Sequence, residues 1–116
     1  MPSSILSLLA ILPALSAEVQ HPDCSGTERW ATSMAFVHLK NARLTDNDAL
    51  DFAKTKTERL ASEQIGPDLF RQIHHIHFTE KSGRKIEVIT VNDASSEECS
   101  MSGVQVYVIS KSLGDA

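Results

Sequence analysis

The sequence has 116 residues, with 11 basic and 15 acidic side chains and a formal net charge of −4. This length allows one domain. The acidic balance and the absence of clustered Lys and Arg argue against sequence-independent nucleic-acid binding. The sequence also lacks a basic amphipathic stretch suited to an anionic membrane, so we expect no membrane partner after signal cleavage. If charge attracts a protein partner, that partner is expected to be basic.

The first seventeen residues, MPSSILSLLAILPALSA, contain no charged side chain. The mainly apolar run from Ile5 to Leu15 is too short to span a bilayer, which needs about 20 apolar residues. Small residues at 16 and 17 complete the pattern of a signal peptide, although no Lys or Arg precedes the run. We therefore expect a signal peptide over residues 1–17, a single small α+β domain over residues 18–116, and a secreted or periplasmic location.

The two cysteines of the chain are Cys24 and Cys99. In an exported small domain, such a pair predicts a disulfide. The alternative makes Cys99 a nucleophile. The neighbouring Glu97 and Glu98 disfavour this alternative, because adjacent carboxylates raise the pKa of a thiol.

Residues 27–41 are predicted to form an amphipathic helix. Ser25 and Glu28 have the spacing of a capping box, and Trp30, Met34 and Val37 recur at helical spacing, with Ala31, Ala35 and Leu39 nearby. The following segment has two interpretations. One is a helix that ends before Gly66-Pro67. The other, which we favour, is a short turn or helix near residues 46–53 and then a polar edge strand over residues 55–64.

The second half of the chain is rich in β-forming residues. Three segments, residues 69–79, 84–91 and 104–110, are separated by turn residues. Together they predict an antiparallel meander of three or four strands with one face covered by the N-terminal helix. The expected fold class is α+β, with one disulfide.

The turn between the first two of these strands determines which side chains share a face. A two-residue turn at Ser82-Gly83 would oppose Lys81 to Arg84. A three-residue loop over residues 81–83, with Gly83 in the left-handed conformation, instead pairs apolar with apolar side chains and opposite charges with each other. The predicted pairs are Glu80–Arg84, Thr79–Lys85, Phe78–Ile86, His77–Glu87 and Ile76–Val88. We therefore predict the three-residue loop.

This register divides a histidine-rich stretch, His74-His75-Ile76-His77, between two faces. His74 faces the core with Ile76, Phe78, Ile86 and Val88, while His75 and His77 lie beside Glu87 on the other face. Two imidazoles two residues apart on a strand, together with a carboxylate, define a candidate metal site of His75, His77 and Glu87. The sequence contains no extended metal-binding motif, such as HExxH or CxxC, that would support this site. An exposed or partner-facing surface is therefore the favoured interpretation, and no cofactor is expected.

Residues 92–103 are predicted to be a polar loop that the disulfide ties to the start of the helix. Loops of this length are usually functional or mobile. The sequence has no phosphate-binding, nucleophile-elbow or metalloprotease motif. We therefore expect an exported, non-enzymatic protein that binds a protein partner, as inhibitor and immunity proteins do. The expected binding residues are Asp93, Glu97 and Glu98, with His75, His77 and Glu87. The alternatives are a small exported metal-binding protein or hydrolase that uses the histidine strand, and an accessory subunit whose sheet pairs with another chain.

Overall fold

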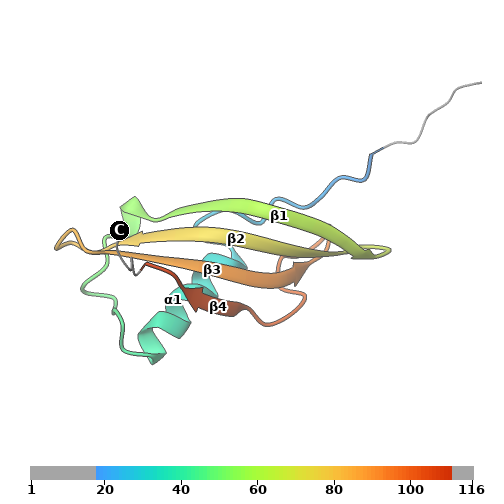
Figure 1. Ribbon diagram of the computed structural model, residues 1–116. Helices are drawn as coiled ribbons and strands as arrows, with labels where there is room; N and C mark the ends of the chain where they lie inside the picture. Colours follow the sequence, from blue (N-terminus) through green and yellow to red (C-terminus); the bar gives the residue numbers. More distant parts are fainter. Residues whose placement is uncertain (1–17, 111–116) are drawn as a thin grey trace, which may run out of the picture.

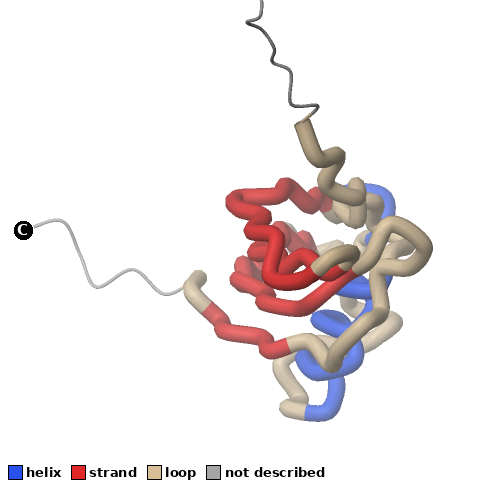
Figure 2. Tube along the Cα trace, turned by 90° about the vertical axis from the view of Figure 1, so that its right-hand side faces the viewer, coloured by secondary structure: helices blue, strands red, loops and turns tan. Residues whose placement is uncertain are grey.

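The computed structural model of the protein describes residues 18–110; the predicted signal peptide and residues 111–116 lie outside this range. The elements are α1 (Trp30–Asn41), the single 3-10 turn η2 (Phe52–Lys54), β1 (Lys56–Gly66), β2 (Leu69–Thr79), β3 (Lys85–Ala94) and β4 (Gln105–Val108). The four strands form one antiparallel sheet in the order β1-β2-β3-β4, and α1 lies on one side of it (Figures 1 and 2). The predicted α+β class and antiparallel meander are confirmed. No helix within residues 18–110 is long and apolar enough to cross a membrane.

The helix differs from its prediction in position. It is not N-terminal in the described chain, because residues 18–29 precede it, and it begins at Trp30 rather than at residue 27. The expected capping box does not form. The backbone N–H and the hydroxyl of Ser25 both donate to Asp23 Oδ1, at 3.1 and 2.6 Å. Ser25 therefore closes a turn before the helix instead of capping its first amides.

The buried face of α1 is rotated from the predicted stripe. Ala31, Ala35 and Leu39 are the buried apolar residues, whereas the Val37 residue is 36% exposed. Trp30 is half-buried, and its indole N–H donates to the carbonyl of Ser102 at 2.9 Å. Because alanine side chains are small, the helix backbone can approach the sheet closely at this face.

The core lies between α1 and the sheet. Its aromatic and aliphatic side chains come from the helix, the loop that follows it, β2 and β3. The cluster comprises Ala35, Leu39, Leu50, Ile76, Phe78, Ile86 and Val88, with Phe36 and Val106 packed against it. Burial of a side chain the size of Leu or Phe stabilises a fold by about 1.5–3 kcal/mol. This cluster fixes the inward face of β2 and β3, so the alternate residues of both strands face outward.

The ambiguous segment after the helix forms the edge strand β1, which confirms the favoured interpretation. β1 pairs only with β2 and has register shifts between Arg59 and Ala61 and between Gln64 and Gly66. Its side chains are mostly exposed, in agreement with a polar edge. Charged side chains on such an edge discourage pairing with another chain.

The β2–β3 hairpin has the predicted register. His77 lies opposite Glu87, Phe78 opposite Ile86 and Thr79 opposite Lys85. The three-residue loop ends at Gly83, which has a φ of 97°. The backbone N–H of Glu80 donates to the carbonyl of Arg84 at 2.7 Å and closes this loop.

The side chain of Glu80 holds the loop after α1 against the hairpin. It accepts hydrogen bonds from Arg84 Nε at 2.9 Å and from the Thr45 hydroxyl at 2.8 Å. These bonds, from Arg84 first and then Thr45, lower the pKa of the Glu80 carboxyl from its usual value. Arg84 Nη2 also donates to the carbonyl of Leu44 at 2.6 Å. The connection between helix and sheet is thus attached to the hairpin end of β2.

The predicted loop over residues 92–103 begins later than expected, because β3 continues to Ala94. Asn92 faces inward, is 3% exposed and donates to the carbonyl of Cys99 at 2.9 Å. Asp93 faces the opposite way, as alternation along a strand requires. The two polar residues resemble a loop in the sequence, but both lie in β3, where Asp93 binds Arg71 of β2 and Asn92 binds the segment that follows the strand. The connection itself is residues 95–104, hereafter the β3–β4 loop.

Candidate functional site

The histidines of β2 lie on the faces that the hairpin register predicts. His74 is 0% exposed, and neither ring nitrogen has a hydrogen-bond partner among the described residues. Burial, and to a lesser extent the charge of Arg59, lowers the pKa of the His74 imidazole. His74 is therefore part of the core, and the surface histidines are His75 and His77.

His75 and His77 lie between two carboxylates on the outer face of the sheet. Their ring centroids are 4.1 Å apart, with an interplanar angle of 35°. From β3, Glu87 Oε1 lies 2.9 Å from His75 Nε2 and 3.7 Å from His77 Nδ1. From β1, Glu58 Oε1 lies 3.8 Å from His75 Nδ1 and 3.6 Å from His77 Nε2. We call these four residues the histidine cluster.

Glu58 was absent from the site predicted from the sequence. The signal that could have found it is the two-residue turn at Pro67-Asp68, between the end of β1 and the start of β2. A regular register carried back from this turn places Glu58 opposite His77. The two irregularities of β1 place it opposite His75 instead, which is two residues away and on the same face. Glu58 therefore belongs to the outer face under either register.

The predicted acidic residues fall into two environments. Asp93 Oδ1 on β3 accepts a hydrogen bond from Arg71 Nε at 3.0 Å, and its side chain is 17% exposed. This bond and the charge of Asp93 raise the pKa of the Arg71 guanidinium. Glu97 and Glu98 are exposed in the β3–β4 loop. Of these three carboxylates, Glu97 and Glu98 are the ones readily available to a partner.

Several bonds hold the backbone around Glu97 and Glu98. The N–H of Ser95 donates to the carbonyl of Glu98 at 2.8 Å, and the N–H of Ser96 donates to Asp68 Oδ1 at 3.0 Å. Beyond the two glutamates, the N–H of Met101 donates to the carbonyl of Asp93 at 3.0 Å. The β3–β4 loop is thus attached to the β1–β2 turn on one side and to β3 on the other.

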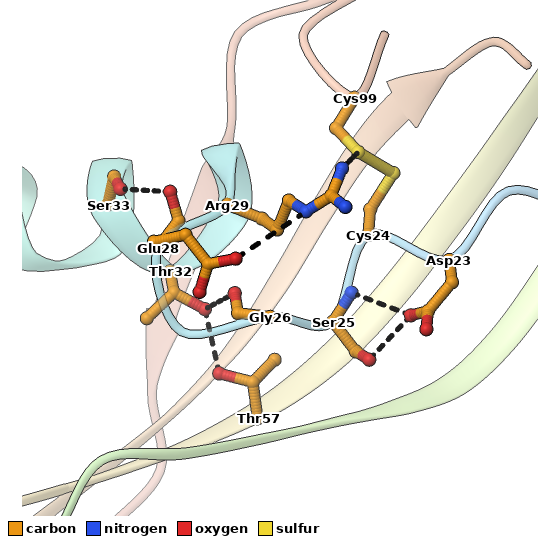
Figure 3. A network of polar contacts seen from close by, with 10 residues as sticks. All are labelled: Asp23, Cys24, Ser25, Gly26, Glu28, Arg29, Thr32, Ser33, Thr57 and Cys99. Carbon is orange, nitrogen blue, oxygen red and sulfur yellow. Dashed lines mark hydrogen bonds and ion pairs between the residues drawn. A yellow bond between two sulfur atoms is a disulfide. The ribbon is translucent and has the colours of Figure 1, made fainter. Parts of the chain in front are cut away.

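The predicted disulfide is present. Cys24 and Cys99 are bonded, with Cα atoms 5.7 Å apart, and the bridge joins the β3–β4 loop to the segment before α1 (Figure 3). Figure 3 also shows Arg29 beside the bridge, with Nη1 at 3.7 Å from Cys99 Sγ. Below it, the hydroxyls of Thr32 and Thr57 are 2.7 Å apart and connect α1 to β1.

The structure does not bring all the predicted site residues together. Glu87 and Asp93 lie on the same face of β3, but they are six positions apart, which corresponds to about 20 Å along a strand. The histidine cluster and the β3–β4 loop are therefore separate surfaces near opposite ends of the sheet.

Comparisons of the chain with protein-family models, curated proteins and solved structures give no match.

Proposed function

We propose that the protein is an exported, non-enzymatic binding protein that recognises a basic region of a protein partner through its β3–β4 loop. The observation that carries this proposal is the combination of a fixed loop backbone with two exposed carboxylates, Glu97 and Glu98. The histidine cluster is a second, separate surface that can contribute to partner binding.

The fixed backbone supports the proposal energetically. Ordering a flexible loop on binding costs free energy, and a loop that is already ordered avoids much of that cost. The disulfide at Cys99 directly follows Glu98 in the sequence and holds that end of the acidic pair. A loop needed only to connect β3 with β4 could be shorter and less constrained.

The charges of the loop indicate the chemistry of the partner. Within residues 18–110, neither Glu97 nor Glu98 forms an ion pair, whereas Asp93 is paired with Arg71. Glu98 Oε2 accepts a hydrogen bond from the Ser100 hydroxyl at 2.9 Å, which orients the carboxylate without neutralising it. Lys and Arg side chains of a partner are the groups that best complement such carboxylates.

The disulfide also bears on location. Disulfides persist in extracellular and periplasmic compartments and are rare in the cytosol of most organisms. The Cys24–Cys99 bridge is consistent with either exported location. Together with the predicted signal peptide, it supports export.

A capture experiment with a charge-reversed variant tests the proposal. The wild-type chain, recovered from the exported fraction, is immobilised, and its intact mass reports whether residues 1–17 are removed. We expect it to retain one protein that elutes at elevated salt, because exposed charges are screened. The Glu97→Lys, Glu98→Lys double variant should lose at least nine-tenths of this retention.

A matched control separates the effect of the loop carboxylates from the effect of the net charge of the protein. Glu18 and Asp48 are exposed and lie outside the β3–β4 loop, so Glu18→Lys with Asp48→Lys changes the net charge by the same amount. This control should retain the captured protein as the wild type does. Equal retention by the loop variant and the wild type, or equal loss in the control, would contradict recognition by the loop.

A further inference from the structure

We infer that the histidine cluster is a binding site for one divalent transition-metal ion, with Glu58, His75 and His77 as ligands and Glu87 as the residue that positions His75. This inference does not rest on partner recognition by the β3–β4 loop, because it concerns a separate surface, the outer face of β1, β2 and β3. It differs from the site predicted from the sequence in the role of the carboxylates. Glu58 replaces Glu87 among the ligands.

The first argument is the convergence of ligand atoms. Glu58, His75 and His77 each offer one ligand atom, and these three atoms all lie within 4.8 Å of one another. Zinc binds imidazole nitrogen and carboxylate oxygen at about 2.0–2.2 Å, which places tetrahedral ligand atoms about 3.4 Å apart. The two nitrogen–oxygen distances to Glu58 are 3.8 and 3.6 Å, close to that spacing. The terminal torsions of the imidazoles are broad, so the two rings can rotate to turn both lone pairs toward one point.

The second argument is the hydrogen bond behind His75. Its Nε2 donates to Glu87 Oε1 at 2.9 Å, so the proton of the neutral ring lies on Nε2. The other nitrogen, Nδ1, then presents its lone pair toward Glu58. A carboxylate that holds the far nitrogen of a ligating histidine is a recurrent arrangement around metal ions, and it fixes both the tautomer and the orientation of the ring.

The third argument is access combined with charge. The side chains of His75, His77 and Glu58 are 20%, 36% and 63% exposed, so an ion can enter from solvent and keep a water molecule as a further ligand. With neutral imidazoles, Glu58 and Glu87 give the cluster a charge of −2, which a divalent ion balances. A groove of about 370 Å³ beside the cluster is also lined by Lys54, Lys56 and Lys85. These cations oppose a metal ion, which makes both carboxylates necessary.

The donor set determines the class of metal. Two imidazoles and one carboxylate suit zinc, copper or nickel, whereas calcium and magnesium require more oxygen ligands. Both cysteines are in the disulfide, so no thiolate is available to select a softer ion. The site is therefore expected to bind Zn²⁺, Ni²⁺ and Cu²⁺ in preference to Ca²⁺ and Mg²⁺.

Isothermal titration of the untagged, disulfide-bonded protein with Zn²⁺ tests the inference, because an added polyhistidine tag would bind the metal itself. We expect one ion per chain, no saturable binding of Ca²⁺, and binding at least tenfold weaker in His77→Gln and in Glu58→Gln. His38→Gln is the matched control, since His38 is exposed on α1 and outside the histidine cluster. It should bind Zn²⁺ as the wild type does.

A test of Glu87 must distinguish positioning of His75 from a general contribution to stability. The Zn²⁺ affinity reports the first, and the melting temperature in EDTA reports the second. Loss of a carboxylate behind a ligating histidine typically weakens metal binding by about 10- to 100-fold. We expect Glu87→Gln to weaken Zn²⁺ binding in this range while its melting temperature in EDTA stays at the wild-type value. Absence of saturable one-to-one binding, or undiminished binding in both His77→Gln and Glu58→Gln, would overturn the metal site. Undiminished binding in Glu87→Gln would overturn its positioning role.

Discussion

At the scale of single residues, His74 is the most buried titratable side chain among residues 18–110. It is fully buried on β2, and its imidazole pKa is lowered by burial first and by the charge of Arg59 second. Asp23 acts in the opposite direction and does not compensate. The folded protein therefore keeps His74 neutral at pH values where the same residue in the unfolded chain is protonated.

This difference predicts a pH-dependent stability. A histidine in an unfolded chain titrates near pH 6.5, and the folded pKa lies below that value. The unfolded state therefore binds more protons between the two pKa values. Stability is full above about pH 6.5 and falls, by at most about 1.4 kcal/mol per pH unit, as the pH drops toward the folded pKa.

Urea denaturation between pH 7 and pH 5 measures this effect in wild type and in His74→Leu. We expect the variant to lose most of the slope, and its stability at pH 7 should change little, because it removes two buried ring nitrogens that lack partners among the described residues. His38→Gln, at an exposed position, should keep the wild-type slope. An unchanged slope in His74→Leu would show that other groups cause the pH dependence.

At the scale of elements, the β2–β3 hairpin depends on one backbone conformation. Gly83 has a φ of 97°, and an added Cβ atom would meet nothing within 4 Å. A substitution there consequently tests conformational strain without a steric clash. Gly103 is a matched control, because its surroundings are equally open and its φ is outside the left-handed region.

We expect Gly83→Ala to destabilise the protein by about 1–2 kcal/mol, since a residue with a Cβ atom is strained in this region. Gly103→Ala should be neutral or slightly stabilising, because alanine restricts the unfolded chain. Chemical denaturation of both variants gives the comparison. Equal stabilities of the two variants would argue against the three-residue loop ending at Gly83.

The same hairpin shows which features of the fold could be predicted from the sequence. Its turn chemistry leaves one register that pairs Phe78 with Ile86 and His77 with Glu87, and the structure has that register. The start of the helix could not be predicted in this way, because Ser25 could either cap the first amides of the helix or bind Asp23. In the structure it binds Asp23. The pairing of Glu58 depends on register shifts in β1 for which the sequence has no clear signal. The end of β3 was misplaced because Asn92 and Asp93 are polar, whereas in the structure both lie in β3, with Asp93 bonded to Arg71 and Asn92 bonded to the carbonyl of Cys99.

At the scale of the whole molecule, the disulfide closes a loop with a sequence separation of 75 residues, which contains α1, β1, β2 and β3. Closing a loop of this length stabilises the fold by about 4.5 kcal/mol in the chain-entropy description, and measured values are often lower. That amount is comparable to the total stability of a small domain, about 5–15 kcal/mol. The bridge is therefore expected to contribute a large part of the stability of the fold.

We expect replacement of both cysteines, Cys24→Ser with Cys99→Ser, to lower the free energy of unfolding by about 3–4.5 kcal/mol. Thermal and urea denaturation of this variant and of the reduced, alkylated wild type should agree. Ser100→Ala, which leaves the bridge intact and lies in the same loop, serves as the control. A double variant as stable as the wild type would mean that the core alone maintains the fold.

The position of the bridge along the chain also has a consequence for synthesis. Cys24 precedes α1 and Cys99 follows β3, and the sequence holds no other cysteine. As the chain emerges from its N-terminus, Cys24 has no partner within the chain until residue 99 has appeared. A chain that stops before residue 99 keeps a free thiol at Cys24, whereas a chain that includes residue 99 can close the Cys24–Cys99 bridge. Formation of an intramolecular disulfide at Cys24 thus distinguishes chains that extend to the β3–β4 loop from chains that end before it.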